Sequence, residues 1–374
     1  MKIKSTRVYV TGNFIPCVLD IEGKTIRQIL PYDTEADVDY KDLRIVPGFI
    51  DIHCHGAYGY DTNDGEPEGL KNWTKNIVQE GVVGLLSTTL TQYKSVLMKA
   101  VKNVADVVKE DEYEGARILG IHFEGPYLNK AHKGAQPEEY CVKPDVEQFK
   151  RYQKAAHGLI KYITMAVEND EDFTLTKYCS QNNVVVSIGH SNATYEQAVQ
   201  AYAHGARSMT HVYNAMTPFT HRANGLVGGA LRIRNMYGEI ICDGNHSTLA
   251  ALNNFFTSKG PDYSIMITDS LMCKGFPVGT KFDFGGQEVV IYPDGSAHLV
   301  EAGNLAGSTL NVNKGLKILI EDALVPVNYA INACTSNPAR CLHVDDRKGT
   351  IGVGYDADLV VLDKDYEVVQ TYCK

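Results

Sequence analysis

The pattern of apolar and polar positions along the chain changes at Pro47-Gly48. Residues 1–46 alternate between apolar and polar positions around turn signals such as Gly23, which is typical of short strands. After Gly48, short apolar runs alternate with segments of helical periodicity, and this alternation indicates strand–helix units and a parallel sheet. The tail of the chain returns to strand-like alternation, so it can pair with the amino-terminal strands.

Eight apolar runs succeed one another through the central part of the chain. They are FIDIHCH, VVGLLSTT, RILGIHFE, KYITMAVE, VVVSIGH, RSMTHVYN, GEIICDGNH and YSIMITD. Between the fifth and sixth runs, Thr194 and Gln197 have the spacing of a helix capping box, and Gly205 marks the helix end. Eight strand–helix units predict an α/β fold of the TIM type, a (β/α)8 barrel whose active site lies at the carboxyl ends of its strands.

The remaining segments predict a domain organisation around this barrel. We expect the barrel to span residues 47–340 and to be inserted into a small β-sandwich domain formed by residues 1–46 and 341–374. Residues 281–300 follow the eighth run and contain a Pro-Asp-Gly turn, which indicates an inserted hairpin. Helical periodicity resumes over residues 309–334.

Composition narrows the classes of function. The net charge of −9 disfavours a nucleic-acid partner, because phosphate backbones are bound by basic faces. No stretch approaches the roughly 20 apolar residues of a membrane span, and the amino terminus has no signal-peptide pattern. The nine cysteines are scattered without a CxxC pair, which favours reduced thiols over disulfides or a zinc knuckle. We therefore expect a cytoplasmic protein with neither a membrane nor a nucleic acid as partner.

His53 and His55 end the first apolar run. Residues two apart on a strand share a face, so both imidazoles can point into the barrel mouth and hold a divalent metal. A His-x-His triplet is common by chance, and its position at a strand end is what favours the metal interpretation.

Glu124, His190 and His211 lie at the ends of the third, fifth and sixth runs. One carboxylate and two imidazoles are a familiar ligand set for catalytic zinc, with one position left open for water. Each of these residues alone could simply be a hydrogen-bonded polar residue at a strand end. Three of them at corresponding strand ends favour a metal centre.

Asp269 ends the eighth run, where a carboxylate can take a proton from an attacking water and deliver it to a leaving amine. An aspartate after a strand also commonly caps the next turn, and only the neighbouring histidines favour the catalytic interpretation. We expect His122, on the same strand face as Glu124, to have a packing or supporting role, and Glu168 to be structural.

With these motifs in place, the sequence from about Val46 to Leu362 resembles the N-acetylglucosamine-6-phosphate deacetylase family of the amidohydrolase superfamily. The motifs that carry the resemblance are VPGFIDIHCHG (46–56), HFEGPYL (122–128), KGAQ (133–136), IGHSNA (188–193), THVYNAM (210–216), CDGNH (242–246), TDS (268–270), LAGST (305–309) and NPAR followed by KGTIGVGYDADLVVLD.

The resemblance implies roles for particular residues. Glu124, His190 and His211 would hold the principal metal, Asp269 would be the catalytic acid and base, and His246 would orient the acetyl carbonyl. Arg222 would bind the substrate phosphate through its fork of donors, and in a homodimer it could come from the neighbouring subunit. The implied substrate contacts are Ala135, Gln136, Asn214, Ala215, Arg222, Asp243, Gly244, Asn245, His246, Leu305, Ala306 and Gly307.

The chain also departs from the family pattern at three places. Some relatives lack the His-x-His pair and use one metal, so His53 and His55 leave one or two metals per subunit open, with Glu124 as a bridge between two. Some relatives carry histidine where this chain has Gln136, and the segment after Asp269 is loosened to SLMCKGFPVG. Zinc is the first candidate for the metal, with iron and manganese left open, because availability and geometry decide between them.

The resulting expectation is an enzyme of amino-sugar catabolism that converts N-acetyl-D-glucosamine 6-phosphate into D-glucosamine 6-phosphate and acetate. The galactosamine epimer stays open as substrate. A cyclic-amide hydrolase is disfavoured, because such enzymes typically bridge two metals with a carboxylated lysine where this chain has Ala166-Val167-Glu168. A catalytically dead sugar-phosphate sensor would have lost a ligand or Asp269, and neither is missing.

Overall fold

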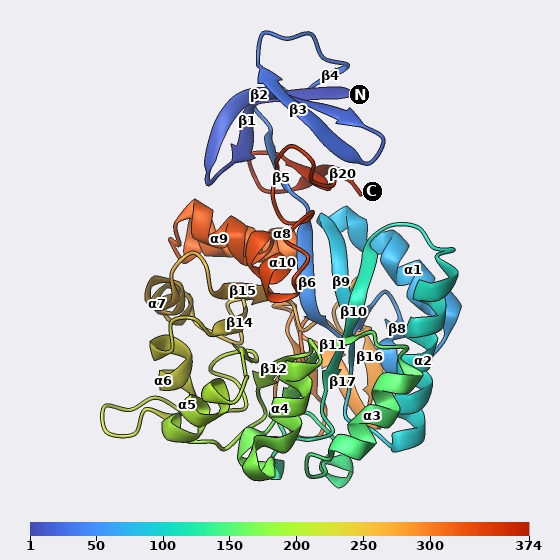
Figure 1. Cartoon of the computed structure of the whole chain (residues 1–374), viewed down its shortest axis with the longest axis vertical. Helices are drawn as coiled ribbons and strands as arrows, with labels where there is room; N and C mark the ends of the chain where they lie inside the picture. The colour runs from blue at the N-terminus through green and yellow to red at the C-terminus, as the bar shows by residue number, and fades with distance from the viewer. Residues whose placement is uncertain (374) are drawn as a thin grey trace.

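The computed structural model describes residues 1–373, and its centre is a barrel of eight parallel strands (Figure 1). In order around the barrel these are β6 (Phe49–Cys54), β9 (Val82–Thr89), β10 (Arg117–Glu124), β11 (Ile160–Met165), β12 (Val185–Ile188), β13 (Ser208–Met209), β14 (Tyr237–Ile241) and β15 (Ser264–Ile267). Each of the eight apolar runs overlaps one of these strands, so the fold class predicted from the sequence is confirmed.

The first and last strands of the barrel meet just beyond their ends. The Asp269 N–H donates a hydrogen bond to the His53 carbonyl (2.8 Å), and the His55 N–H donates to the Ser270 carbonyl (2.9 Å). On the barrel interior, Thr268 Oγ1 donates to the Asp51 carboxylate at 2.6 Å. These bonds nearly close the barrel and fix Asp269 beside the two histidines of the first strand.

An outer layer of helices surrounds the barrel (Figure 1). Thr194 and Gln197 form the expected capping box at the start of α5, and Gly205 follows the helix end with a φ of +117°. The α-helices are α1 (Pro67–Ile77), α2 (Lys94–Glu110), α3 (Val146–Ala155), α4 (Thr174–Gln181), α5 (Tyr195–Ala203), α6 (Gly225–Arg232), α7 (Leu249–Lys259), α8 (Val312–Lys317), α9 (Val327–Ala333) and α10 (Ser336–Cys341). A π-helical turn, Ile318–Asp322, continues α8.

Both ends of the chain contribute to a second, smaller domain (Figure 1). Its strands form one hydrogen-bonded sheet in the order β20 (Val368–Tyr372), β19 (Leu359–Leu362), β5 (Arg44–Pro47), β1 (Lys2–Val10), β2 (Asn13–Glu22) and β3 (Thr25–Pro31), with β4 (Val38–Asp39) also paired to β1. This sheet has its own hydrophobic core, which includes Ile3, Leu19, Ile45 and Leu359. The domain boundaries proposed from the sequence stay a prediction.

The segment after β15 forms the expected hairpin region. It is a three-stranded antiparallel sheet of β16 (Lys281–Phe284), β17 (Gln287–Ile291) and β18 (Ala297–Leu299). Its apolar face packs against Leu90, Leu271 and Ala306, which lie on loops at the carboxyl ends of the barrel strands. A short ribbon of β7 (Gly56–Ala57) and β8 (Tyr60–Asp61) lies after the first barrel strand.

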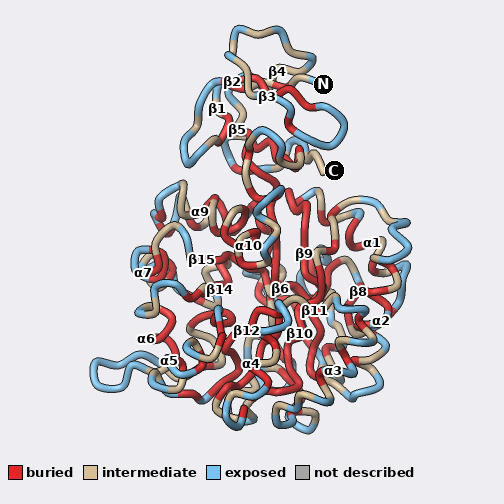
Figure 2. The backbone as a smooth tube through the Cα atoms, viewed as in Figure 1, coloured by how far each residue is buried: buried red, intermediate tan, exposed pale blue. Residues whose placement is uncertain are grey.

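Burial follows this architecture (Figure 2). The barrel strands and the inner faces of the helices are buried, whereas the loop of residues 218–224, which precedes α6, is exposed and projects from the molecule. None of the helices within residues 1–373 has the length and apolar character needed to cross a membrane.

Candidate metal and substrate site

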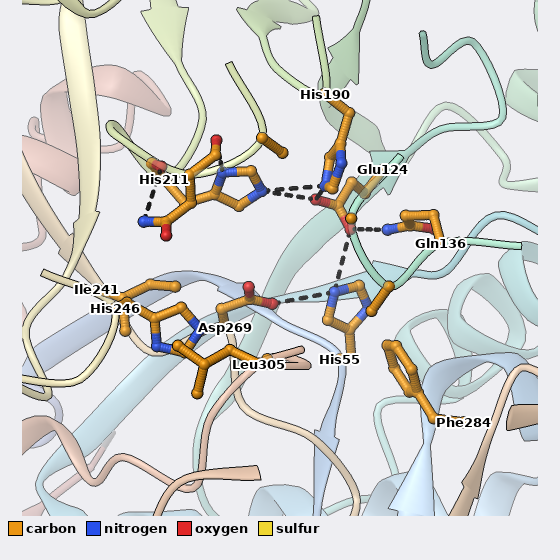
Figure 3. A pocket seen from close by; sticks show the side chains of 15 residues that line it. His55, Glu124, Gln136, His190, His211, Ile241, His246, Asp269, Phe284 and Leu305 are labelled. Carbon is orange, nitrogen blue, oxygen red and sulfur yellow. Dashed lines mark hydrogen bonds and ion pairs between the residues drawn. The ribbon is translucent and has the colours of Figure 1, made fainter. Parts of the chain in front are cut away.

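Six buried side chains with metal-binding atoms converge at the carboxyl end of the barrel (Figure 3). They form two groups, His53 with His55 and Asp269, and Glu124 with His190 and His211. Within each group the candidate ligand atoms lie within 4.8 Å of one another. The structure thus brings together all five residues expected to bind metal and the expected acid and base.

The Glu124 carboxylate lies between the two groups. Its Oε1 is 3.4 Å from the Nε2 atoms of His53, His190 and His211. Its Oε2 is 3.2 Å from His55 Nε2 and accepts a hydrogen bond from Gln136 Nε2 at 2.6 Å. Oε1 therefore faces imidazoles of both groups and Oε2 faces His55, so Glu124 contacts histidines of both groups.

The hydrogen bonds of His190 and His211 determine which ring nitrogen is free. His190 Nδ1 donates to the His132 carbonyl at 2.9 Å, and His211 Nδ1 donates to the Asn214 carbonyl at 3.2 Å. Because a carbonyl only accepts, both Nδ1 atoms carry the proton and both Nε2 atoms keep a lone pair. This is the arrangement that second-sphere hydrogen bonds impose on metal-binding histidines.

Unpaired buried atoms give a test of whether a divalent cation fits. His53 Nε2 and Glu124 Oε1 are buried without a hydrogen-bond partner. Each such unpaired buried group lowers the stability of the folded state by about 1–3 kcal/mol. The Nε2 atoms of His190 and His211 are 3.2 Å apart, close to the ~3.3 Å between two nitrogens that each lie ~2.05 Å from a tetrahedral metal. The donor set and its spacing therefore fit a divalent metal.

The electrostatic balance of the site comes from opposite charges held out of water. Burial alone would raise the pKa of Glu124, but the facing imidazoles, led by His53, hold it well below its ordinary value. Burial opposes protonation of His55, yet Asp269 and Glu124 raise its pKa to about 9. In the metal-free protein His53 and His55 therefore carry positive charge that a cation would replace.

Asp269 occupies the same cavity, with Oδ1 3.2 Å from His55 Nε2 and 3.5 Å from His53 Nε2. Its backbone has a φ of +51°, and His190 and His211 have φ values of +45° and +28°. Such values are uncommon for residues other than glycine and concentrate at functional sites, where the surrounding structure holds the strain. The barrel bonds at Asp269 N and His55 N supply that support here.

A cavity of about 160 Å³ opens above these groups. Its lining residues are His55, Glu124, Gly134, Ala135, Gln136, His190, His211, Asn214, Ala215, Ile241, His246, Asp269, Phe284, Leu305 and Gly307. Seven of the expected substrate contacts thus reach the cavity, namely Ala135, Gln136, Asn214, Ala215, His246, Leu305 and Gly307. The other expected contacts, Arg222, Asp243, Gly244, Asn245 and Ala306, are not among the lining residues.

Asp243 acts on the cavity through His246. Its carboxylate accepts hydrogen bonds from His246 Nδ1 at 2.7 Å and from the His246 N–H at 2.9 Å. Burial works against the charged imidazole, but the Asp243 carboxylate raises the pKa of His246 above its ordinary value. His246 carries an Nε2–H that it can donate in its imidazolium form, which the Asp243 carboxylate favours.

Sequence analysis did not identify several residues of the site. Phe284 reaches the cavity from the inserted sheet, and Ile241 reaches it from β14. Glu239 is fully buried on β14 and contacts His53. An acidic residue inside the apolar run GEIICDGNH was a signal that could have identified Glu239, whereas nothing in the sequence pattern distinguished Phe284.

His122 and Glu168 have supporting positions. His122 is fully buried, its ring centroid is 4.4 Å from that of His53, and burial holds its pKa well below the ordinary value. Glu168 accepts hydrogen bonds from Ser191 Oγ and the Asn192 N–H, both at 2.6 Å. Glu168 thereby anchors the segment that follows His190.

Comparison with known proteins identifies the class that this fold and site define. Residues 44–374 match the amidohydrolase family, and the chain belongs to that family. The resemblance expected from the motifs is therefore confirmed.

Several of the similar proteins are deacetylases of sugar phosphates. The chain is 39% identical over 346 residues to N-acetylglucosamine-6-phosphate deacetylase of Bacillus subtilis (strain 168), covering 92% of this chain and 86% of the relative. It is 32% identical over 339 residues to N-acetylgalactosamine-6-phosphate deacetylase of Escherichia coli O157:H7, covering 91% of this chain and 88% of that relative. The chain is also similar to a solved structure of N-acetyl-D-glucosamine-6-phosphate deacetylase from Mycobacterium smegmatis, a variant in complex with N-acetyl-D-glucosamine 6-phosphate. The TM-score is 0.93 at 25% sequence identity, and the match covers 100% of this chain and 97% of that structure.

Proposed function

We propose that this chain hydrolyses the acetamide of N-acetyl-D-glucosamine 6-phosphate to D-glucosamine 6-phosphate and acetate, in amino-sugar catabolism. The observation that carries the proposal is the convergence of Glu124, His190 and His211 with Asp269 in one cavity. The names of the relatives support the substrate, since the Bacillus subtilis protein and the Mycobacterium smegmatis complex both concern this sugar phosphate.

In this proposal Glu124, His190 and His211 hold the principal metal, and His53 and His55 contribute a second site. A divalent metal bound there would supply an activated water near neutral pH by lowering the pKa of that water from about 15.7 toward 7. Zinc is our first choice, because two imidazoles and a carboxylate suit it, and iron and manganese are the alternatives.

In this proposal one side chain of the cavity transfers the proton, and another donates a hydrogen bond to the acetyl carbonyl. Asp269 would accept the proton of the attacking water and give it to the departing amine, for which its open side toward the cavity suits it. His246, held by Asp243, would donate its Nε2–H to the acetyl oxygen as negative charge develops there. Figure 3 shows both side chains bordering the same space.

Within residues 1–373, no lysine or arginine is among the residues that line the cavity, so a permanently charged partner for the phosphate would come from outside it. Arg222 is exposed on the projecting loop of residues 218–224 and does not line the cavity of its own chain. We propose that the active form is a homodimer in which Arg222 of one subunit binds the phosphate in the site of the other. The guanidinium fork suits this task because it can make paired hydrogen bonds to phosphate oxygens.

The galactosamine epimer is the second candidate substrate, supported by the Escherichia coli relative. Acetate release from the two epimeric 6-phosphates and from their unphosphorylated sugars separates the candidates. We expect N-acetylglucosamine 6-phosphate to give the highest kcat/KM and the bare sugars to react poorly. A preference for the galactosamine compound would replace the proposed substrate, and hydrolysis of cyclic amides in its place would replace the reaction.

We also propose a cytoplasmic location. All nine cysteines are free thiols, and eight of them are buried. Free thiols are stable in a reducing compartment, which supports that location.

A further inference from the structure

A fully buried carboxylate lies beneath the candidate metal site. Glu239, on β14, has no exposed surface, and its Oε2 is 2.9 Å from His53 Nδ1. Its Oε1 has no hydrogen-bond partner, and another polar group near the carboxylate is the Tyr162 hydroxyl, whose pKa is raised by burial and by Glu239. Among residues 1–373, His53 is its one ion-pair partner within 4.0 Å. A carboxylate taken out of water costs several kcal/mol unless it is paired, so this group requires an explanation.

The Glu239 contact fixes the orientation and the tautomer of His53. A carboxylate accepts, so His53 Nδ1 donates and carries the ring proton. In the neutral form that binds metal, the lone pair is then on His53 Nε2, which has no hydrogen-bond partner and faces Glu124 Oε1 at 3.4 Å and Asp269 Oδ1 at 3.5 Å. Glu239 therefore turns the coordinating nitrogen of His53 toward Glu124 and Asp269.

The partner of His53 also differs in charge from the partners of His190 and His211. His190 and His211 donate to neutral main-chain carbonyls, whereas His53 donates to a carboxylate. A carboxylate behind a metal-binding imidazole raises its basicity as well as orienting it. Two divalent cations would bring four positive charges, of which Glu124 and Asp269 offset two, and Glu239 supplies one more negative charge.

A neighbouring carboxylate provides a contrast. Asp51 is also buried, two residues before His53 on β6, but it accepts hydrogen bonds from Thr268 Oγ1 at 2.6 Å and from main-chain N–H groups. Asp51 thus joins two strands of the barrel, whereas Glu239 is directed at an imidazole.

We infer that Glu239 is a positioning residue that makes His53, with His55 and Asp269, a second metal site. The inference rests on the proposed metal roles of these residues. Without Glu239, His53 could rotate or take the other tautomer. The group of His53, His55 and Asp269 would then lose a ligand. The group of Glu124, His190 and His211 would keep all three of its ligands.

Zinc binding to four proteins tests this inference. Metal-free wild type, Glu239→Gln, His53→Ala and the double variant are dialysed against buffers of fixed free Zn²⁺, and bound zinc is measured by elemental analysis. We expect two zinc ions in wild type, and in Glu239→Gln an unchanged first affinity with a second affinity about 10–100-fold weaker. In the His53→Ala background, Glu239→Gln should change nothing further, because Glu239 acts through His53.

The contrary outcomes are equally definite. Wild-type affinity for both zinc ions in Glu239→Gln, one zinc ion in wild type, or a further loss in the double variant would each overturn the inference. If Glu239→Gln does not fold, Glu239→Asp withdraws the carboxylate by one methylene and should weaken the second zinc alone. Acetate release is assayed separately, so two bound zinc ions without deacetylation would refute the proposed function and leave Glu239 in its role.

Discussion

At the scale of residues, the site separates two carboxylates by their surroundings. Both line the cavity, but the Glu124 side chain is 2% exposed and lies among imidazoles with Gln136 at its Oε2, whereas the Asp269 side chain is 13% exposed. Glu124 is therefore placed to bind a cation, and Asp269 is placed to exchange protons with a substrate.

This difference gives a prediction for Asp269→Asn. The amide keeps the shape of the side chain but cannot shuttle a proton, so turnover should fall by roughly 10²–10⁴-fold. Metal at Glu124, His190 and His211 should persist, which elemental analysis can establish. Near-native turnover with metal intact would remove Asp269 from the mechanism.

The Asp243–His246 pair gives a prediction for pH dependence. Asp243 raises the pKa of His246, so wild type keeps the imidazolium to a higher pH than an unpaired histidine would. In Asp243→Asn that support is lost, and activity should decline at a lower pH on the alkaline side. Rate profiles of both proteins measure the shift, and superimposable alkaline limbs would show that His246 does not need its proton.

At the scale of elements, the predictable part of the molecule is the part that local pattern determines. The run RILGIHFE became β10 and YSIMITD became β15 with the segment that ends in Asp269, because their apolar pattern and length specify strands. Parallel strands around a barrel place their carboxyl ends together, so the convergence of His53, Glu124 and Asp269 followed from topology.

Contacts made across elements were not predictable in this way. Phe284 lies on an inserted sheet, and its approach to within 6.0 Å of the His55 ring centroid depends on packing against Leu90 and Leu271. The placement of Arg222 outside its own cavity likewise depends on the direction of a loop. Neither is encoded in a periodic pattern.

The end of α7 gives a prediction about stability. Burial lowers the pKa of Lys259 from 10.5 to about 7, while its Nζ donates to the Ile233 carbonyl at 2.7 Å. Between about pH 7 and 10.5 the unfolded chain binds more protons than the folded one, so stability rises with pH over this window. Below pH 7 the cost of the buried charge is fully present.

Lys259→Met removes that titration. Relative to wild type, the variant should be most stable at or below pH 7, and the difference in Tm should shrink toward pH 10. Melting curves of both proteins across this range test the prediction. A difference in Tm that does not vary with pH would show that Lys259 has an ordinary pKa.

At the scale of the whole molecule, an acidic protein has to bind an anionic sugar phosphate. With a net charge of −9, phosphate binding would depend on few local cations, and Arg222 is the candidate. Arg222→Ala should raise KM for the phosphorylated substrate far more than for the bare sugar. Equal damage toward both substrates would contradict the phosphate role.

Mixed dimers test whether the site is shared. Arg222→Ala and Asp269→Asn subunits are each impaired alone, but a hybrid dimer would contain one site with both residues intact. Mixing them should therefore restore part of the activity. Well-formed hybrids without recovery would contradict sharing of Arg222 between subunits.

The most direct test of the account is acetate release from N-acetyl-D-glucosamine 6-phosphate before and after metal removal. The purified protein should release acetate and glucosamine 6-phosphate in equal amounts, lose that activity on dialysis against a chelator, and regain it with Zn²⁺, Fe²⁺ or Mn²⁺. Activity that survives complete removal of metal, or a metal-loaded protein that releases no acetate, would contradict the account.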